Sequence, residues 1–174
     1  MNLEFRLAVK NDLNTIYSMF REAIDEMNKN GILQWDNIYP NKETLQDDIE
    51  KSQMYVGFIN DKIVSAFVLN KEYDKEYENG KWQYNSEYLI VHRLCVIPEF
   101  QNCGVGTLTM KHIEKIAKTW GAETIRLDCF TKNPYAVRMY QKLGYNTVGF
   151  ADWRKGRFYL MEKSIKSLDK LAVH

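Results

Sequence analysis

The stretch QNCGVG, residues 101–106, joins an apolar run at 88–96 to a helix-like segment that begins near residue 105. A strand that passes through a glycine turn into a helix leaves unpaired N–H groups and the positive end of the helix dipole at that turn. Together these groups can bind an anion such as a phosphate. The sequence therefore predicts an anion site or, in the plainer alternative, a tight turn that needs glycine for its backbone angles.

Two nucleotide-binding motifs can be compared with this turn. A P-loop requires GxxxxGK[ST], which the chain does not contain. A dinucleotide-binding fingerprint requires a third small residue where this chain has Thr109, although Asp128 follows near the position of an acid that binds ribose. Such folds place their cofactor unit near the start of several βαβ repeats, whereas this unit begins halfway along the chain. A Rossmann-type dinucleotide binder is therefore the weaker alternative.

Hydrophobic periodicity predicts the other elements. Strands are expected at 3–9, 54–60, 62–70, 88–96, 123–130, 145–151 and 157–164, and helices at about 12–30, 105–120 and 134–143, with a short helix after Asn41. Asn60 and Asp61 are expected to turn a hairpin. The segment between residues 71 and 87 is expected to be a loop or a strand extension. The order of elements predicts one α/β (α+β) domain over residues 1–174 with a mixed sheet.

Composition excludes several classes of function. The chain has 24 basic and 23 acidic residues, a net charge of +1 that offers no long-range field to a nucleic acid or an anionic membrane. It has no apolar run of the ~18 residues that span a bilayer and no signal-peptide core, so we expect a cytoplasmic protein. Cys95, Cys103 and Cys129 form no CxxC pair and share no ligand spacing with the histidines, which predicts free thiols and no metal site.

Residues 88–150 resemble the central region of the GNAT superfamily, the acetyl-CoA-dependent N-acyltransferases. The resemblance rests on a strand that ends in Leu94-Cys95-Val96, a Q/R-x-x-G-x-G/A turn at Gln101, Gly104 and Gly106, and an N-x-x-A-x-x-x-Y-x-x-x-G-[FY] segment at Asn133, Ala136, Tyr140, Gly144 and Tyr145. Each pattern is weak alone, but their order and spacing together indicate the family. The resemblance implies a mostly antiparallel mixed sheet that splays between strands 4 and 5, flanked by about four helices.

The same resemblance implies acetyl-CoA as the cofactor. The glycine turn would wrap the pyrophosphate, the backbone of the preceding strand would pair with the pantetheine arm, and Asn133 would bind that arm from the other side of the opening. Gln101 would add a side-chain donor and Thr107 a hydroxyl. The implied cofactor-binding residues are Leu94, Cys95, Val96, Gln101, Asn102, Cys103, Gly104, Val105, Gly106, Thr107, Asn133 and Tyr140.

Acetyl transfer to an amine requires a neutral nitrogen, a polarised carbonyl and a proton for the departing thiolate. The resemblance implies that a backbone N–H near Val96 polarises the carbonyl and that Tyr140, protonated at pH 7, is the general acid; a core aromatic is the alternative for Tyr140. His92 is the candidate base because, on a regular strand, its side chain would point to the same face as those of Leu94 and Val96. A structural histidine and an ordered water as base are the alternatives.

Residues that bind the acceptor are implied in three places: the loop after the first helix, the segment before the fourth strand, and the last hairpin. The candidates there are Trp35, Tyr39, Glu87 and Trp153. Aromatic and acidic residues suit a small-molecule amine and a peptide equally. We expect an N-acetyltransferase that moves an acetyl group directly to a primary amine, without nucleic-acid or membrane partners, and compatible with a homodimer. A non-catalytic acyl-CoA-binding or regulatory module of the same fold is the alternative.

Overall fold

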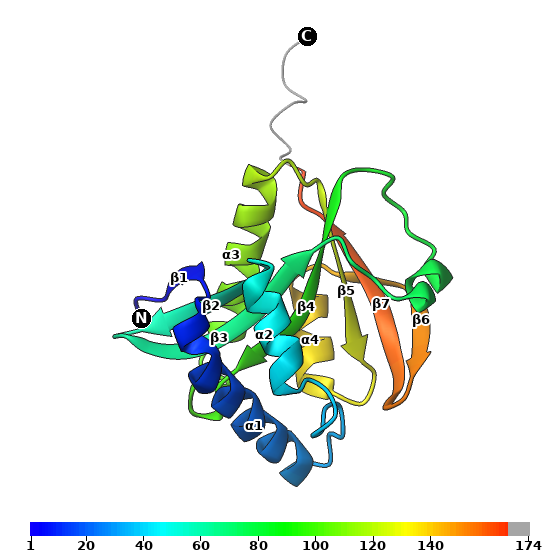
Figure 1. Ribbon diagram of the computed structural model, residues 1–174. Coiled ribbons are helices and arrows are strands. Elements are labelled where there is room, and N and C mark those ends of the chain that lie inside the picture. The colour runs from blue at the N-terminus through cyan, green and yellow to red at the C-terminus, as the bar shows by residue number, and fades with distance from the viewer. Residues whose placement is uncertain (167–174) are drawn as a thin grey trace.

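The computed structural model describes residues 1–166, which form one sheet with helices on both faces (Figure 1). The 7 strands have the order β1-β2-β3-β4-β5-β7-β6, in which β4 and β5 are parallel and the other neighbours antiparallel. The strands are β1 (Glu4–Leu7), β2 (Met54–Ile59), β3 (Lys62–Asn70), β4 (Tyr88–Val96), β5 (Thr124–Phe130), β6 (Asn146–Trp153) and β7 (Gly156–Ser164). The helices are α1 (Leu13–Lys29), α2 (Lys42–Glu50), α3 (Val105–Thr119) and α4 (Pro134–Lys142), with 3₁₀ helices η1 (Lys10–Asp12), η2 (Lys75–Asn79) and η3 (Pro98–Phe100).

These elements confirm the α/β (α+β) class, the mostly antiparallel mixed sheet and its flanking helices. The Rossmann alternative is wrong, because a doubly wound fold requires a mostly parallel sheet. Local sequence signals explain several boundaries. The side chain of Asn41 accepts the Thr44 N–H at 2.8 Å and so caps α2. Asn60 and Asp61 turn the β2–β3 hairpin with φ angles of 47° and 63°. Among residues 1–166, no helix is long and apolar enough to span a bilayer.

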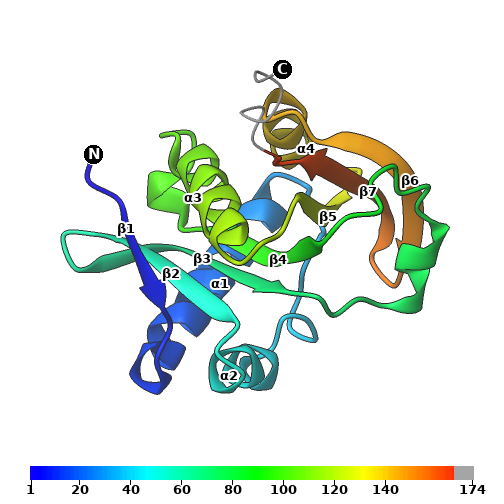
Figure 2. The same ribbon diagram turned by 90° about the horizontal axis from the view of Figure 1, so that it is seen from above.

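Helices α1 and α2 lie on one face of the sheet, and α3 and α4 lie on the other (Figure 2). On the first face, Ile16 and Phe20 of α1 pack against Val56 and Val68. The core of the second face includes Leu89, Val91, Met110, Ile113, Leu127 and Tyr140. Strands β3, β4 and β5 are thus buried on both faces, which explains their nearly continuous apolar sequences.

Residues 71–87, which we call the strap, cross the part of the first face that α1 and α2 leave uncovered. Tyr77 of η2 is buried and packs with Ile90 and Leu160 of the sheet. A side chain at Gly149 of β6 would meet the backbone oxygen of Asn79 at 2.9 Å, so glycine allows the strap to approach β6 closely. The strap is therefore a loop with one 3₁₀ helix, the first of the two expectations, and it packs on the sheet as a cover.

The parallel strands β4 and β5 separate part-way along their length. Their pairing ends at Val91 and Leu127. Just beyond this point, His92 and Cys95 of β4 pair with Val68 and Ala66 of β3. The two β4 residues are three positions apart and their β3 partners only two, so β4 has a bulge here. Arg93, inside the bulge, has a φ angle of 50°. A bulge bends its strand and increases the local twist, so β4 turns away from β5. The splay expected between strands 4 and 5 is confirmed.

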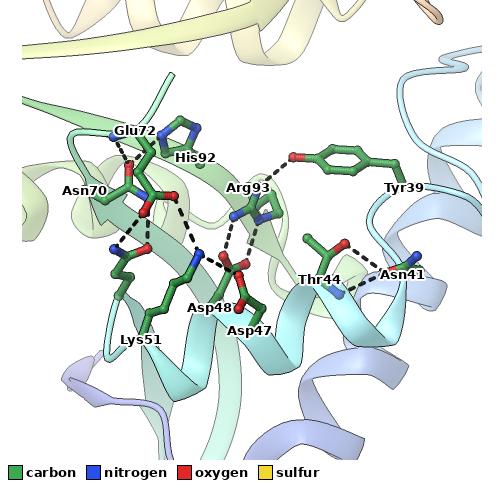
Figure 3. Close-up of polar contacts among 11 residues, drawn as sticks. Tyr39, Asn41, Thr44, Asp47, Asp48, Lys51, Asn70, Glu72, His92 and Arg93 are labelled. Carbon is green, nitrogen blue, oxygen red and sulfur yellow. Dashed lines mark hydrogen bonds and ion pairs between the residues drawn. The ribbon is translucent and has the colours of Figure 1, made fainter. Parts of the chain in front are cut away.

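Arg93 fixes the bulge by an ion pair with α2 (Figure 3). Its Nε donates to Asp48 Oδ2 at 2.8 Å, and Nη2 donates to the other carboxylate oxygen. The side chains of Arg93 and Asp48 are only 13% and 6% exposed. A positive φ at a residue other than glycine costs about 1–3 kcal/mol, and the bidentate ion pair between Arg93 and Asp48 offsets this strain. Nη1 of Arg93 also donates to the Tyr39 hydroxyl at 2.6 Å.

Substitution of Asp48 tests this role. Asp48→Ala should lower the free energy of unfolding in urea by about 3–5 kcal/mol, because it leaves the Arg93 guanidinium buried without a counterion. The control is Asp47→Ala on the same helix, whose carboxylate is 58% exposed and pairs with Lys51; it should cost about 0.3–0.5 kcal/mol. Equal losses in the two variants would show that the Arg93–Asp48 pair does not hold the bulge.

Candidate active site

A cavity of ≈ 1160 Å³ occupies the opening between β4 and β5. The residues that line it come from both faces of the sheet. On the α3 and α4 side they include Leu94, Gln101, Asn102, Gly104, Gly106, Thr107, Asn133, Ala136, Met139 and Tyr140; on the α1 and strap side they include Trp35, Tyr39, Tyr73, Asp74, Tyr77, Asp128 and Trp153. A molecule in the cavity can therefore reach through the sheet from one face to the other.

The glycine turn forms one end of this cavity. Gly104 has a φ angle of 84°, and a Cβ atom built there would have no neighbour within 4 Å. A Cβ atom at Gly106 would meet Met139 Sδ at 2.9 Å. The first hydrogen bond of α3 runs from Leu108 N–H to Gly104 C=O, so the amides of residues 105–107 precede it. Both glycines thus keep the helix N-terminus clear of side chains, as a phosphate-binding turn requires.

Side chains of the turn differ in their positions. Asn102 and Thr107 line the cavity. Gln101 also lines the cavity, and its Nε2 donates one hydrogen to the Val96 carbonyl at 3.0 Å, so a contact with a phosphate would use the second Nε2 hydrogen. Val105 is buried in the core on the α1 face, and Cys103 is exposed with its thiol directed at the Gln101 carbonyl. Cys103 and Val105 can therefore contribute to an anion site only through their backbone.

The end of β4 presents backbone groups to the opening. Ile97 N–H donates to Val64 C=O of β3, and successive residues of an antiparallel strand point their backbone groups to opposite sides. The N–H of Val96 therefore points away from β3, toward the opening, where a carbonyl could accept it. Leu94 packs on the α3 and α4 face, whereas the Cys95 side chain is buried against the α1 layer.

Asn133 caps α4, because its Oδ1 accepts the Ala136 N–H at 3.2 Å. Its Nδ2 donates to Gln34 Oε1 at 2.9 Å. The contact with Gln34, a residue that the sequence analysis did not single out, ties the loop after α1 to the start of α4. Both ends of the Asn133 amide are thus engaged within the protein, and a contact with a pantetheine arm would use the remaining Nδ2 hydrogen.

Tyr140 lies on α4 and faces the opening. The residue is 7% exposed and lines the cavity, and no group in residues 1–166 hydrogen-bonds its hydroxyl. Burial raises the pKa of Tyr140 well above its ordinary value, so the phenol is protonated at neutral pH. Tyr145, packed edge-on against it at 5.8 Å between ring centroids, instead donates its hydroxyl to Glu114. Of this pair, Tyr140 is the one placed to donate a proton into the cavity.

The matching family model is that of the acetyltransferase (GNAT) family, over residues 16–145. The chain belongs to this family. It is 25% identical over 162 residues to YesJ, an uncharacterized N-acetyltransferase of Bacillus subtilis, with 91% of this chain and 88% of YesJ covered. It is 22% identical over 171 residues to the S-(2-succino)cysteine N-acetyltransferase of the same organism, with 95% and 98% covered.

Solved structures of GNAT proteins share the fold. An acetyltransferase of the family from Streptococcus agalactiae has a TM-score of 0.81 at 24% identity, with 95% of this chain and 96% of that one covered. The PaiA N-acetyltransferase from Thermoplasma acidophilum, crystallised with coenzyme A, has a TM-score of 0.71 at 22% identity, with 94% and 99% covered. By the match to the family model, the protein is a GNAT acetyltransferase whose cofactor is acetyl-CoA, which favours an enzyme over a non-catalytic binding module.

His92 does not share a face with Leu94 in this GNAT enzyme, because the bulge at Arg93 reverses the alternation. The parity expectation is therefore wrong. The ring of His92 lies on the α2 side, and its Nε2 is 2.8 Å from Asn70 Oδ1 (Figure 3). Because that oxygen also accepts the Glu72 N–H, it is an acceptor and Nε2 carries the proton. Burial, with the nearby Arg93 charge, lowers the pKa of His92 to about 4.

Asp128 and Tyr77 form a pair in the cavity that the sequence analysis did not anticipate. The Tyr77 hydroxyl donates to Asp128 Oδ2 at 2.6 Å. Burial raises the pKa of Asp128 to about 6, although the hydrogen bond from Tyr77 acts in the opposite direction. The sequence does contain one signal, a single carboxylate inside the apolar strand TIRLDCF. Its partner lies 51 residues away in the strap, and no local pattern indicates this contact.

Three of the four expected acceptor residues line the cavity: Trp35, Tyr39 and Trp153. Trp35 is also part of the core, where it packs against Phe20 at 5.4 Å between ring centroids. The structure does not bring Glu87 to the site. Its carboxylate pairs with Lys71 at 2.6 Å on the surface, just before β4 begins at the opposite end from the opening.

A charged cluster closes one side of the acceptor half. Asp36, in the loop after α1, accepts from both terminal nitrogens of Arg154 at 2.7 and 3.0 Å, and from Lys155 at 3.3 Å. Arg154 and Lys155 form the turn between β6 and β7. Hydrogen bonding to Arg154 lowers the pKa of Asp36 well below its usual range. The loop and the last hairpin are thus joined across the mouth of the cavity.

The phosphate role of the turn can be tested with two glycines of the same backbone conformation. Gly104→Trp should raise the acetyl-CoA dissociation constant about tenfold or more, because the side chain would stand between the turn amides and the phosphates. Gly121→Trp is the control: Gly121 has a φ angle of 80°, also has no neighbour at its Cβ position, and lies past the other end of α3. Both should lose similar stability, about 1–2 kcal/mol. Equal affinities by calorimetry would contradict the phosphate assignment.

Proposed function

We propose that the protein transfers the acetyl group of acetyl-CoA directly to the primary amine of a small molecule. The supporting observation is the cavity that passes between β4 and β5 and joins the glycine turn to an aromatic and acidic pocket. The cofactor would approach from the α3 and α4 side, and the acceptor from the side of α1 and the strap. The acetyl carbon and the acceptor nitrogen would then meet where the strands separate.

A small acceptor is favoured over an extended peptide because the acceptor half is bounded on one side by an ion-paired contact. Asp36 and Arg154 join the loop after α1 to the β6–β7 hairpin, and a peptide chain would have to pass between these segments. The similarity to a bacterial S-(2-succino)cysteine N-acetyltransferase points the same way, because the acceptor named there is a small amino acid derivative. Trp35, Tyr39 and Trp153 would form the apolar walls around such an acceptor.

Direct transfer is favoured over an acetyl-cysteine intermediate. Cys95 and Cys129 are buried, and burial raises the pKa of Cys129 to about 12. Only a thiolate attacks a thioester efficiently, so neither buried thiol is an effective nucleophile at neutral pH. Cys103 is exposed but does not line the cavity. The three free thiols are also consistent with the reducing cytoplasm, where we place the enzyme.

Tyr140 would supply the proton for the departing thiolate. A buried phenol is a weak acid, but a thiolate in the same surroundings is a correspondingly strong base. The buried thiol of Cys129, which packs in the same cluster as Tyr140, shows this effect, since burial raises its pKa as well. The amide of Val96 would stabilise the negative charge that develops on the carbonyl oxygen.

The acceptor class can be tested by measuring CoA release from acetyl-CoA with four panels: amino acid derivatives such as S-(2-succino)cysteine, aryl alkylamines, polyamines, and peptides with a free N-terminus. We expect turnover with one of the small-amine panels and none with peptides. Turnover confined to peptides would contradict the small-molecule acceptor. No turnover with any panel, together with normal acetyl-CoA binding, would favour the non-catalytic module.

The role of Tyr140 predicts a separation of turnover from binding. Tyr140→Phe should lower kcat by about 10²–10⁴-fold, while calorimetry shows an acetyl-CoA dissociation constant near that of the wild type. Tyr145→Phe removes a neighbouring hydroxyl that bonds Glu114, so it should leave kcat within about threefold. An undiminished rate in Tyr140→Phe would make Tyr140 a core aromatic only.

A further inference from the structure

We propose that Asp128, oriented by Tyr77, binds the ammonium group of the acceptor and accepts the proton that the nitrogen must lose before it attacks. This assignment rests on the proposed amine acetyltransferase activity and adds the base, for which the sequence offered His92 or an ordered water. It also names the group of the acceptor that the pocket recognises, a primary ammonium ion.

The position of Asp128 in the sheet supports this role. Leu127 is the last residue of β5 that pairs with β4, so Asp128 is the first residue of β5 beyond the separation. Side chains alternate along the strand, and Leu127 and Cys129 pack with Tyr140 on the α3 and α4 face. Asp128 therefore points to the opposite face. The base and the acid lie on the two sides of the opening, as transfer between an acceptor and a cofactor on opposite faces requires.

The strap fixes the carboxylate in place. Tyr77 is buried, and its ring lies 5.7 Å from that of Trp82 and 6.2 Å from that of Trp153, measured between centroids. Tyr73 stacks on its outer side at 5.9 Å. These contacts hold the Tyr77 hydroxyl at 2.6 Å from Asp128 Oδ2. Tyr73, Tyr77 and Trp153 also line the cavity, so aromatic faces surround the place where an ammonium group would meet the carboxylate.

The charges around Asp128 suit a base at neutral pH. The titratable groups that face it are Tyr77 and Asp74 of the strap, Arg93 of β4 and Tyr39 of the loop after α1, while Cys129 and Tyr140 lie near it on the other face of the sheet. Burial raises the pKa of Asp128, Tyr77 lowers it, Asp74 raises it and Arg93 lowers it, with a result of about 6. Asp128 is therefore mainly ionised at pH 7, yet more basic than an exposed aspartate.

His92 is less suited to this role. Its Nε2 proton is engaged with Asn70, and the pKa of about 4 makes the ring a poorer proton acceptor than Asp128. The ring also lies beside α2 and Asn70, with Arg93 following it in the bulge (Figure 3). His92 instead secures Asn70, and with it the start of the strap.

The protons of the reaction balance with these two residues. The acceptor enters as R–NH₃⁺ and loses one proton to the Asp128 carboxylate, which later releases it to water. The neutral nitrogen forms a bond with the acetyl carbon, and the carbon–sulfur bond breaks. Tyr140 gives its proton to the leaving sulfur and regains one from the acylated nitrogen, which keeps its last hydrogen in the amide. The overall products are the N-acetyl amine, CoA–SH and one proton.

Asp128→Asn tests the assignment. With the panel amine of highest turnover, the variant should lose about 10²–10⁴-fold in kcat/KM at pH 7, while its acetyl-CoA dissociation constant by calorimetry stays within about threefold of the wild type. Asp152→Asn is the matched control, because Asp152 lies on β6, pairs with Arg157 and is 66% exposed. It should leave kcat/KM unchanged. An active wild type whose rate survives Asp128→Asn would overturn this assignment and leave the proposed function intact.

The pH dependence separates a base from a structural residue. In the wild type, kcat/KM should fall below a midpoint near pH 6, where Asp128 is protonated. In Asp128→Asn the midpoint near pH 6 should disappear. Instead, kcat/KM should rise about tenfold per pH unit up to the pKa of the amine, because only the neutral amine can then react. Tyr77→Phe removes a hydrogen bond that lowers the pKa of Asp128, so in this variant the midpoint of the fall in kcat/KM should move to higher pH.

Other outcomes are equally informative. If kcat/KM of the wild type instead falls below a midpoint near pH 4, and this fall disappears in His92→Gln, the base is His92 and the role of Asp128 is overturned. A wild type that binds acetyl-CoA but releases no CoA with any panel amine would overturn both this inference and the proposed function, since no acceptor nitrogen would then need a base.

Discussion

The separation of β4 from β5 is the constraint on which the rest of the active site depends. Two parallel strands that paired along their full length would bury the sheet interior and leave no passage between its faces. Here the pairing ends at Val91, where the bulge around Arg93 begins. The strained backbone is held by a buried ion pair with Asp48 of α2. A charge pair outside the reacting centre thus maintains the opening in which the reaction takes place.

The same opening gives the two faces of the sheet different tasks. On one face, glycines at the start of α3 leave backbone amides free for phosphates, and α4 directs Tyr140 into the cavity. On the other face, the strap and the loop after α1 form a pocket with aromatic walls. Because neighbouring residues of β5 point to opposite faces, one short strand presents Asp128 to the acceptor side and Cys129 to the side of Tyr140. In the proposed mechanism, alternation along β5 therefore places the base, Asp128, and the acid, Tyr140, on opposite faces of the sheet.

Local sequence patterns predicted most of the fold and many of the residues that line the α3 and α4 side of the cavity. Hydrophobic periodicity, the Asn41 and Asn133 caps and the glycine turn depend on neighbours within a few residues, and these agree with the structure. The expectation for His92 failed because parity assumes a regular strand, and a bulge is not visible in a pattern of apolar residues. The contact of Gln101 with the Val96 carbonyl was not foreseen for a related reason, since Val96 lies across a turn whose shape the sequence does not specify.

The contacts that assemble the acceptor half could not be predicted because they join distant segments. Tyr77 and Asp128 are 51 residues apart, Gln34 and Asn133 are 99 apart, and Asp36 and Arg154 are 118 apart. Each of these contacts joins a loop or the strap to a distant element, namely β5, the start of α4 or the β6–β7 turn. Such segments can change without disturbing the central strands or the glycine turn. A family pattern therefore identifies the cofactor, whereas the acceptor depends on long-range contacts that only the folded chain brings together.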